Sequence, residues 1–181
     1  MRAIVFDQPG DESVLRLGEA PRPSCGRSDL RIRVRAAGVN RADLLQRQGM
    51  YPPPPGASPV LGLECAGIVA EVGGDVRGWQ VGERAMALLA GGGYAQEVVV
   101  DAGSALHVPA HFSDEQAAAF PEVHLTVFLN VFQIGALPED GWALVHGGGS
   151  GIGTAAIRMI RAAGAHVIVT AGSDEKCRRC L

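Results

Sequence analysis

The sequence predicts a β-rich domain over residues 1–120, followed by part of an α/β domain over residues 121–181. Three observations support this prediction. Apolar residues alternate with arginines from Leu30 to Ala36, which is the period of a half-buried strand. Ser113 and Gln116 form a helix-start signal after a series of short strands. A glycine-rich segment, Gly147–Gly153, then stands between an apolar strand and a helix.

The composition excludes several classes of protein. Of the 181 residues, 47% are hydrophobic and 19% are charged, which is too apolar for a disordered chain, and the 25 glycines follow no collagen-like period. The formal charge of −3 includes no basic excess, so we expect no nucleic-acid partner. No segment approaches the ~18 apolar residues of a membrane span, and the apolar run at 3–6 is too short for a signal peptide. We therefore expect a cytoplasmic protein with no membrane partner.

Seven short strands are expected in the first domain. Clusters of glycine, proline and aspartate separate them, which favours a compact, barrel-like β domain. The expected strands are 3–6, 14–17, 30–36, 67–72, 83–89, 95–100 and 105–108. The three arginines of the 30–36 strand are expected to face solvent. A short helix, Arg41–Gln48, ends at Gly49 and leads into Tyr51 and Pro52–Pro55, a stiff run that either braces a loop or binds a proline-recognising module.

The second domain begins with interrupted helical spacing from Ala117 to Ile134, which passes Pro121. A short apolar strand follows at Ala143–Val145, then the glycine-rich loop, a helix at about 151–163 and a strand at His166–Thr170. This order is typical of the βαβ unit that opens a Rossmann domain and binds dinucleotides.

The loop itself carries the pattern Gly151-x-Gly153-x-x-Ala156. Missing side chains let the backbone approach a pyrophosphate, and the helix N-terminus supplies unpaired N–H groups and the positive end of its dipole. A merely tight turn would not need five glycines between Gly147 and Gly153. The loop therefore predicts a dinucleotide site.

The end of the second strand indicates which dinucleotide is bound. An NAD-binding domain commonly has Asp or Glu about 20 residues beyond the loop, whereas this chain has Ala171, Gly172 and Ser173. Small residues, the Ser173 hydroxyl and the following Lys176 leave room and a cation for the extra phosphate of NADPH. We therefore expect NADPH as the cofactor. The alternative is that Lys176 is an ordinary exposed helix lysine.

The four cysteines, at positions 25, 65, 177 and 180, are expected to be buried or idle thiols. Cys177-x-x-Cys180 lacks the second pair that a structural zinc site needs. Its two cysteines are either neighbours on one helix face or a redox pair.

Three segments together resemble the medium-chain dehydrogenase/reductase superfamily: Ala37–Asp43, Leu61–Gly67 and His146–Gly153. Within it, the run Asn40–Gly49 followed by Tyr51 and the prolines resembles the zinc-free quinone oxidoreductases, particularly the tumour-suppressor-inducible subgroup. The resemblance implies a GroES-like catalytic domain, a Rossmann domain behind it and NADPH-dependent quinone reduction.

No metal ligand is expected at the catalytic positions. Where zinc-dependent relatives have Cys and His, this chain has Asn40 and Leu63, which supply neither a thiolate nor an imidazole. The cofactor would then supply the hydride, and the protein would position the substrate and exclude water.

The resemblance also implies which residues form the site. Tyr51 and Asn40 would line the quinone side, where a phenol and an amide can hydrogen-bond a carbonyl that gains charge. Alternatively, Tyr51 anchors a loop, Asn40 occupies a turn and Thr126 is an internal helix residue. The residues expected to bind the cofactor are Thr126, Gly149, Ser150, Gly151, Ile152, Gly153, Gly172, Ser173 and Lys176.

Two other functions remain open: an NADPH-dependent enoyl or alkenal double-bond reductase, and a non-catalytic NADPH-binding or interaction protein. A Rossmann domain has six strands, and this chain ends after the second, so we expect a fragment of a longer parent. The expected partner is a small-molecule quinone, and the full-length parent is expected to be a homodimer.

Overall fold

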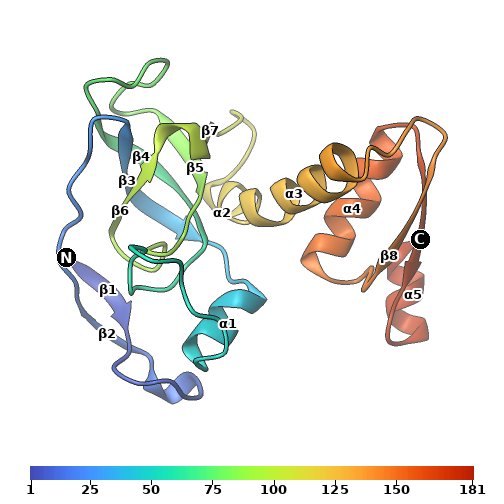
Figure 1. Cartoon of the computed structure of the whole chain (residues 1–181), viewed down its shortest axis with the longest axis horizontal. Helices are drawn as coiled ribbons and strands as arrows, with labels where there is room; N and C mark the ends of the chain where they lie inside the picture. The colour runs from blue at the N-terminus through green and yellow to red at the C-terminus, as the bar shows by residue number, and fades with distance from the viewer. The chain divides into compact units, whose positions relative to one another are not determined.

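A curled five-stranded antiparallel sheet forms the centre of the first of two units, Met1–Glu122 and Val123–Leu181, in this computed structural model of residues 1–181 (Figure 1). The strands follow the spatial order β6-β3-β4-β5-β7. Their bounds are Asp29–Ala37 (β3), Glu64–Val72 (β4), Arg84–Leu88 (β5), Glu97–Asp101 (β6) and Ala105–His107 (β7). A second sheet consists of the antiparallel pair β1 (Arg2–Val5) and β2 (Arg16–Glu19). The predicted β-rich first part is confirmed.

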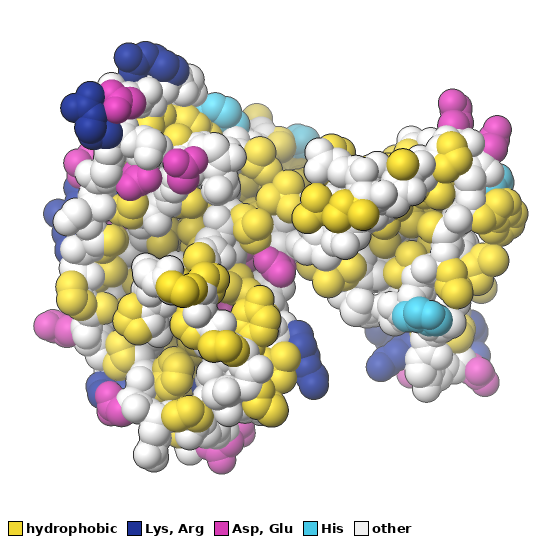
Figure 2. All heavy atoms as spheres, viewed as in Figure 1, with side chains coloured by type: hydrophobic (Ala, Val, Ile, Leu, Met, Phe, Trp, Pro, Cys, Tyr) yellow, Lys and Arg dark blue, Asp and Glu magenta, His cyan; other side chains and the backbone are white.

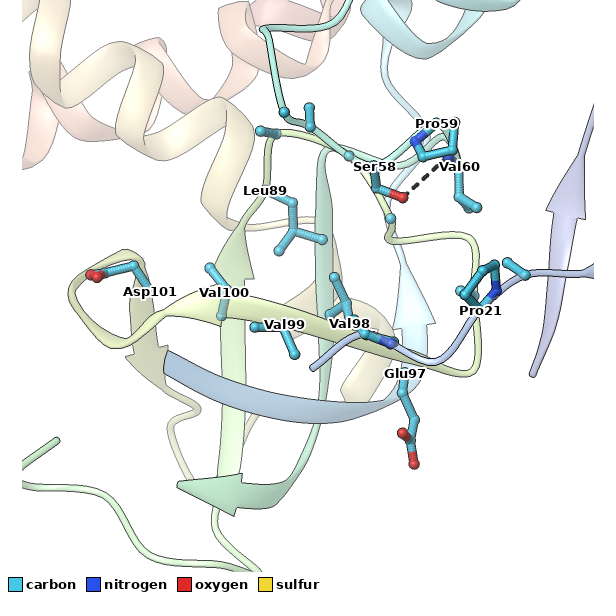
Figure 3. Close-up of a pocket in the computed structure, with 18 of the residues that line it drawn as sticks. Pro21, Ser58, Pro59, Val60, Leu89, Glu97, Val98, Val99, Val100 and Asp101 are labelled. Atoms are coloured by element: carbon cyan, nitrogen blue, oxygen red, sulfur yellow. Dashed lines mark hydrogen bonds between the residues drawn. The ribbon is translucent and has the colours of Figure 1, made fainter. Parts of the chain in front are cut away.

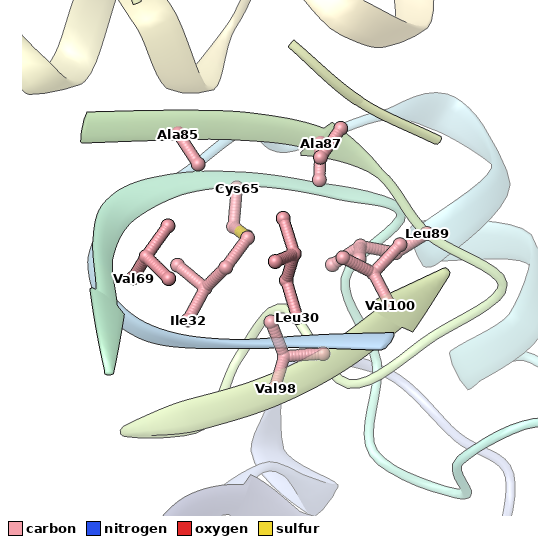
Figure 4. Close-up of a cluster of buried hydrophobic side chains, with 10 residues drawn as sticks. Leu30, Ile32, Cys65, Val69, Ala85, Ala87, Leu89, Val98 and Val100 are labelled. Carbon is pink, nitrogen blue, oxygen red and sulfur yellow. The ribbon is translucent and has the colours of Figure 1, made fainter. Parts of the chain in front are cut away.

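The interior of the five-stranded sheet is a cluster of aliphatic side chains from β3, β4, β5 and β6 (Figure 4). Leu30 and Ile32 of β3 are completely buried and point into it, as the alternation predicted. Two register irregularities in the β3–β4 pairing, between Arg31 and Ile32 and between Val34 and Ala36, are β-bulge positions. Bulges increase the local bend and twist of a sheet, which helps this one to curl around its core.

All three arginines of β3 were predicted to face solvent, but one of them does not. The Arg31 side chain is only 16% exposed, and it forms ion pairs with Glu71 and Glu97. Arg33 and Arg35 are exposed as expected. Because the two acidic partners lie on neighbouring strands of the same sheet, the period-two pattern alone could not identify Arg31 as a paired side chain.

Several predicted strand boundaries were wrong, and the starts of β2 and β4 are two examples. Val14 belongs to a 3-10 turn, Glu12–Val14, whose cap Asp11 accepts a hydrogen bond from the backbone of Ser13 (3.0 Å), so β2 starts only at Arg16. Strand β4 starts at Glu64 rather than at Gly67. Its first four residues are all buried, so no polar–apolar alternation marks the beginning of the strand.

The interrupted helical segment predicted over 117–134 consists of separate helices. Helix α2 (Asp114–Ala118) ends before Pro121, where α3 (Pro121–Val127) begins, and a π-helix covers Phe128–Ile134. Proline lacks the N–H that a continuous helix would need. The capping box at the start of α2 is confirmed: Ser113 Oγ accepts from the Gln116 N–H (3.2 Å), and Gln116 Oε1 accepts from the Ser113 N–H (3.0 Å).

The second unit contains the predicted βαβ arrangement. Strands β8 (Trp142–His146) and β9 (His166–Thr170) pair in parallel, and helix α4 (Gly151–Ala162) connects them (Figure 1). Ala156 and Ile160 of α4 pack on the inner side of the strands with Val145 and Val167. Helix α5 (Asp174–Cys180) follows β9. The outer side of the strands is bare: Trp142, Leu144 and Ile168 are each more than half exposed.

The molecular surface carries charges of both signs. On the face shown in Figure 2, acidic and basic side chains are interspersed around the first unit. No helix combines the length and the hydrophobicity that a membrane crossing requires.

Candidate functional site

Within the first unit, the buried carboxylate of Asp43 connects helix α1 (Arg41–Arg47) to its surroundings. This carboxylate accepts hydrogen bonds from the backbone N–H groups of Asn40 (2.8 Å) and Gly62 (3.1 Å) and from the hydroxyl of Tyr94 (3.0 Å). Burial, followed by the negative charge of Asp43, raises the pKa of the Tyr94 phenol well above its usual value, so Tyr94 serves as a hydrogen-bond donor here. Asp43 therefore links the start of α1 to two loops.

Glu64, at the start of β4, is only 2% exposed and links α1 to α3. Its Oε1 accepts from the Nδ2 of Asn40 (2.8 Å), and its Oε2 accepts from the backbone N–H of Glu122 (2.9 Å). A Cβ at Gly38 would collide with the Glu64 carboxylate, so glycine at this position leaves the space that the acid occupies. Glu64 therefore bonds one side chain and one backbone N–H, which is a structural arrangement for a buried carboxylate.

Tyr51 lines a small pocket in the first unit. The pocket has a volume of about 160 Å³, which is below the ~300–1,000 Å³ typical of drug-sized ligands and suits a single ring. Its polar side chains are Tyr51, Gln46 and Glu122, and its walls are Pro53, Pro54, Leu63 and residues 88–90. The proline run therefore forms part of a pocket wall.

The other predicted substrate residue, Asn40, does not line this pocket. Its amide nitrogen is bonded to Glu64 instead. Sequence reasoning missed Gln46 and Glu122. Gln46 lies on the same short helix as the predicted motif, but no local signal indicates that it faces Tyr51.

The carboxyl of Glu122 lies in an environment that disfavours its charged form. Burial raises the pKa of its carboxyl above the usual value of 4.5, and the negative charges of Glu64 and Asp43 raise it further. Half-buried acids of this kind are common at functional sites.

A larger cavity of about 670 Å³ lies beside β6 (Figure 3). Val98 and Val100 from the strand, with Pro21 and Leu89, give it a mostly apolar wall. Its main polar groups are already engaged, since Ser58 Oγ accepts from the Val60 N–H (3.2 Å) and Glu97 is paired with Arg22. The smaller Tyr51 pocket is therefore the better candidate for chemistry.

In the second unit, the glycine loop is packed so closely that it excludes side chains. A Cβ at Gly153 would overlap the carbonyl oxygen of Gly147, and one at Gly148 would lie 2.7 Å from Cβ of Val169. Ser150 caps α4, and its Oγ accepts from the Gly153 N–H (3.0 Å). The loop is thereby held against the start of the helix.

The outer side of the loop is open. The nearest atoms that a Cβ at Gly149 would meet are the aliphatic carbons of the Lys176 side chain, at 3.9 Å, so this side chain lies next to an open backbone surface. The N–H groups of Gly151 and Ile152, the first two residues of α4, have no acceptor within the helix. Such a helix start, with glycine beside it, is the usual place for an anionic phosphate.

The remaining predicted cofactor residues occupy three positions in this unit. Ser173 caps α5, where its Oγ accepts from the Lys176 N–H (3.3 Å), and a Cβ at Gly172 would meet nothing within 4 Å. Thr126 lies in α3, where its carbonyl accepts from the Asn130 amide (2.8 Å). The structure thus brings Lys176 to the glycine loop and leaves the role of Thr126 as a prediction.

The structure contains no cluster of three or more His, Cys, Asp or Glu side chains arranged to hold a metal ion. Leu63, which precedes Glu64 in the chain, lines the Tyr51 pocket. The side-chain amide of Asn40 donates a hydrogen bond to Glu64. Cys65, on the same strand, is completely buried, and burial raises the pKa of its thiol to about 12.

Residues 26–110 match the family model of the alcohol dehydrogenase GroES-like domain. The chain contains this domain. It is also 35% identical, over 173 residues, to a phenolphthiocerol/phthiocerol polyketide synthase from Mycobacterium tuberculosis, covering 96% of this chain and 8% of that protein. It is 36% identical over 159 residues to the human synaptic vesicle membrane protein VAT-1 homolog-like, covering 88% of this chain and 38% of that protein. The chain thus spans well under half the length of these relatives.

Three solved structures have the same fold over nearly the whole chain. Human VAT-1 homolog-like protein matches with a TM-score of 0.90 and 33% identity, covering 100% of this chain and 60% of that one. Escherichia coli quinone oxidoreductase, complexed with NADPH, matches with a TM-score of 0.86 and 32% identity, covering 99% of this chain and 55% of that one. The CurK enoyl reductase matches with a TM-score of 0.89 and 25% identity, covering 98% of this chain and 56% of that one. The predicted membership of the medium-chain dehydrogenase/reductase superfamily is confirmed.

Proposed function

We propose that this protein is an NADPH-dependent quinone oxidoreductase that works without zinc. The observation that carries the proposal is the glycine loop, where Gly148 and Gly153 exclude side chains and Lys176 lies beside the open backbone at Gly149. Similarity to a quinone oxidoreductase complexed with NADPH supports the same conclusion. NADPH, when bound, supplies the hydride.

The chain's own residues hold that cofactor through its phosphates. The free N–H groups of Gly151 and Ile152 would donate to the pyrophosphate, and Ser150 keeps the loop in the required shape. Lys176 and the Ser173 hydroxyl would bind the additional phosphate of NADPH. Thr126 is proposed to pack near the nicotinamide ribose.

The quinone would occupy the Tyr51 pocket. The Tyr51 hydroxyl can donate to a quinone oxygen as negative charge develops there, and the apolar wall formed by Leu63 and Pro53 limits access of water. Asn40 is proposed to act through Glu64, whose carboxylate it orients, because its side chain does not line the pocket.

The proposal that zinc is absent rests on donor chemistry. Asn40 and Leu63 offer no thiolate or imidazole, and Glu64 is committed to Asn40 and to the Glu122 backbone. A cytoplasmic location, a homodimeric parent and a domain boundary near residue 120 remain predictions.

An enoyl or alkenal double-bond reductase is the second candidate, because the CurK enoyl reductase shares this fold. Both reactions accept a hydride, so the acceptor distinguishes them. A non-catalytic NADPH-binding protein would bind the cofactor without turning it over.

The first test is a titration of the purified protein with NADPH and, separately, with NADH, followed by fluorescence of Trp142 and Trp79. NADPH oxidation is then measured with a simple quinone and with an enone. Preferential NADPH binding and faster quinone reduction support the proposal. Faster enone reduction favours the double-bond reductase, and tight binding without oxidation of NADPH favours the non-catalytic protein.

A further inference from the structure

Glu122 is the only carboxylic acid in the wall of the Tyr51 pocket. It is the second residue of α3, and its backbone N–H is held by Glu64 Oε2 at 2.9 Å. Its side-chain carboxyl makes no hydrogen bond. The backbone of this pocket-lining residue is therefore fixed, and no hydrogen bond holds its acid end.

Three carboxyls lie close together here, and they differ in their hydrogen bonds. Asp43 accepts hydrogen bonds from two N–H groups and one hydroxyl, and Glu64 accepts hydrogen bonds from two N–H groups. Glu122 has no such donors and faces the negative charges of both neighbours. Burial and these charges raise the pKa of Glu122 above its usual value, which favours the protonated form of this acid.

We propose that Glu122 donates the proton that the acceptor needs when it takes up a hydride in the Tyr51 pocket. A quinone that gains hydride becomes a hydroquinone monoanion. The O–H bond of Glu122 then breaks, its proton bonds to the anionic oxygen, and neutral hydroquinone forms. The Glu122 carboxylate regains a proton from water, so that NADPH, one proton and the quinone yield NADP⁺ and hydroquinone. This role rests on the proposed function.

Glu122 and Tyr51 have different roles at the pocket: Glu122 transfers the proton, and Tyr51 forms a hydrogen bond. A carboxylic acid is a far stronger acid than a phenol, so it transfers its proton more readily. Tyr51, which is 45% exposed, orients the acceptor oxygen by a hydrogen bond. Glu64 also holds the Glu122 backbone, and the negative charges of Glu64 and Asp43 both act on the Glu122 carboxyl.

The test compares Glu122→Gln, which keeps the shape but has no acidic proton, with Glu122→Asp, which keeps the acid. Glu12→Gln, at an exposed glutamate of the same unit, is the matched control. We expect kcat/KM for quinone to fall by about 100-fold in Glu122→Gln. Glu122→Asp should recover part of the rate, Glu12→Gln should match the wild type, and all variants should bind NADPH within about twofold of the wild type.

The pH profile identifies proton donation specifically. In the wild type, kcat/KM should decline as the pH rises through the raised pKa of Glu122, because only the protonated acid donates. Glu122→Asp should retain this decline, and Glu122→Gln should lose it. A Glu122→Gln enzyme with a rate within threefold of the wild type and an unchanged profile would falsify the proton role.

Thermal stability gives a readout that does not depend on turnover. The folded state binds the Glu122 proton more tightly than the unfolded state, so the wild type should lose stability relative to Glu122→Gln as the pH rises above the usual glutamate pKa. A Tm difference that stays constant across that range contradicts the proposal. If the wild type reduces no quinone, the proposed function fails together with this role, whereas normal turnover by Glu122→Gln removes the role alone.

Discussion

The amide nitrogen of Asn40 donates to Oε1 of Glu64 over 2.8 Å, and this bond joins the start of α1 to the first residue of β4. The second oxygen of Glu64 holds the start of α3. A single buried carboxylate therefore fixes two elements that support the Tyr51 pocket, and loss of either partner should disturb both stability and the pocket.

Asn40→Ala should destabilise the protein by about 1–3 kcal/mol, because it leaves one oxygen of a buried carboxylate without this donor. Quinone turnover should fall while NADPH affinity stays unchanged. Asn130→Ala is the control, since Asn130 Nδ2 donates to an exposed backbone carbonyl. Urea unfolding and steady-state kinetics measure the effects, and equal losses from the two variants would contradict a special role for the Asn40–Glu64 bond.

Gly153→Ala should abolish measurable NADPH binding. The new Cβ would overlap the backbone oxygen of Gly147, so the loop has to move away from the start of α4. Gly74→Ala is the matched control because a Cβ there meets nothing within 4 Å. Isothermal titration with NADPH checks this, and wild-type affinity in a folded Gly153→Ala protein would argue against a phosphate site at this loop.

Ser150→Ala and Ser113→Ala remove the same kind of helix cap from different units. Each should cost about 1 kcal/mol of stability, because one N–H at a helix start loses its acceptor. Only Ser150→Ala should weaken NADPH binding, by roughly 2–10-fold. Thermal denaturation and fluorescence titration of both variants measure this, and a matching loss of affinity in Ser113→Ala would show that reduced stability alone explains the effect.

Lys176 is the only lysine in the chain, so amine-reactive reagents can label only this side chain and the N-terminus. NADPH should protect Lys176 from labelling and leave the N-terminal amine, bonded to the Ala20 carbonyl, unaffected. Lys176→Ala should raise the Kd for NADPH by roughly 10-fold and leave that for NADH unchanged. Mass spectrometry after labelling gives the answer, and equal labelling with and without NADPH would mean that Lys176 lies outside the site.

Several local features could be predicted because they depend on residues close together in the chain. The capping box needs only Ser113 and Gln116, and the buried side of β3 needs only the alternation of Leu30 and Ile32 with arginines. The helical break at Pro121 was harder. A proline is compatible with either the end of one helix or the start of the next, and here it begins α3.

The sequence by itself determined the β-rich first part, the βαβ arrangement, the glycine loop and the superfamily, because periodicity and short motifs encode them within a few residues. Only the tertiary structure decided that Arg31 is paired and that Asn40 serves Glu64 rather than lining the pocket. It also decided that Glu122 shares that pocket with Tyr51. These outcomes depend on contacts between residues far apart in the chain, and burial changes the energy of a charge or a hydrogen bond only once those contacts exist.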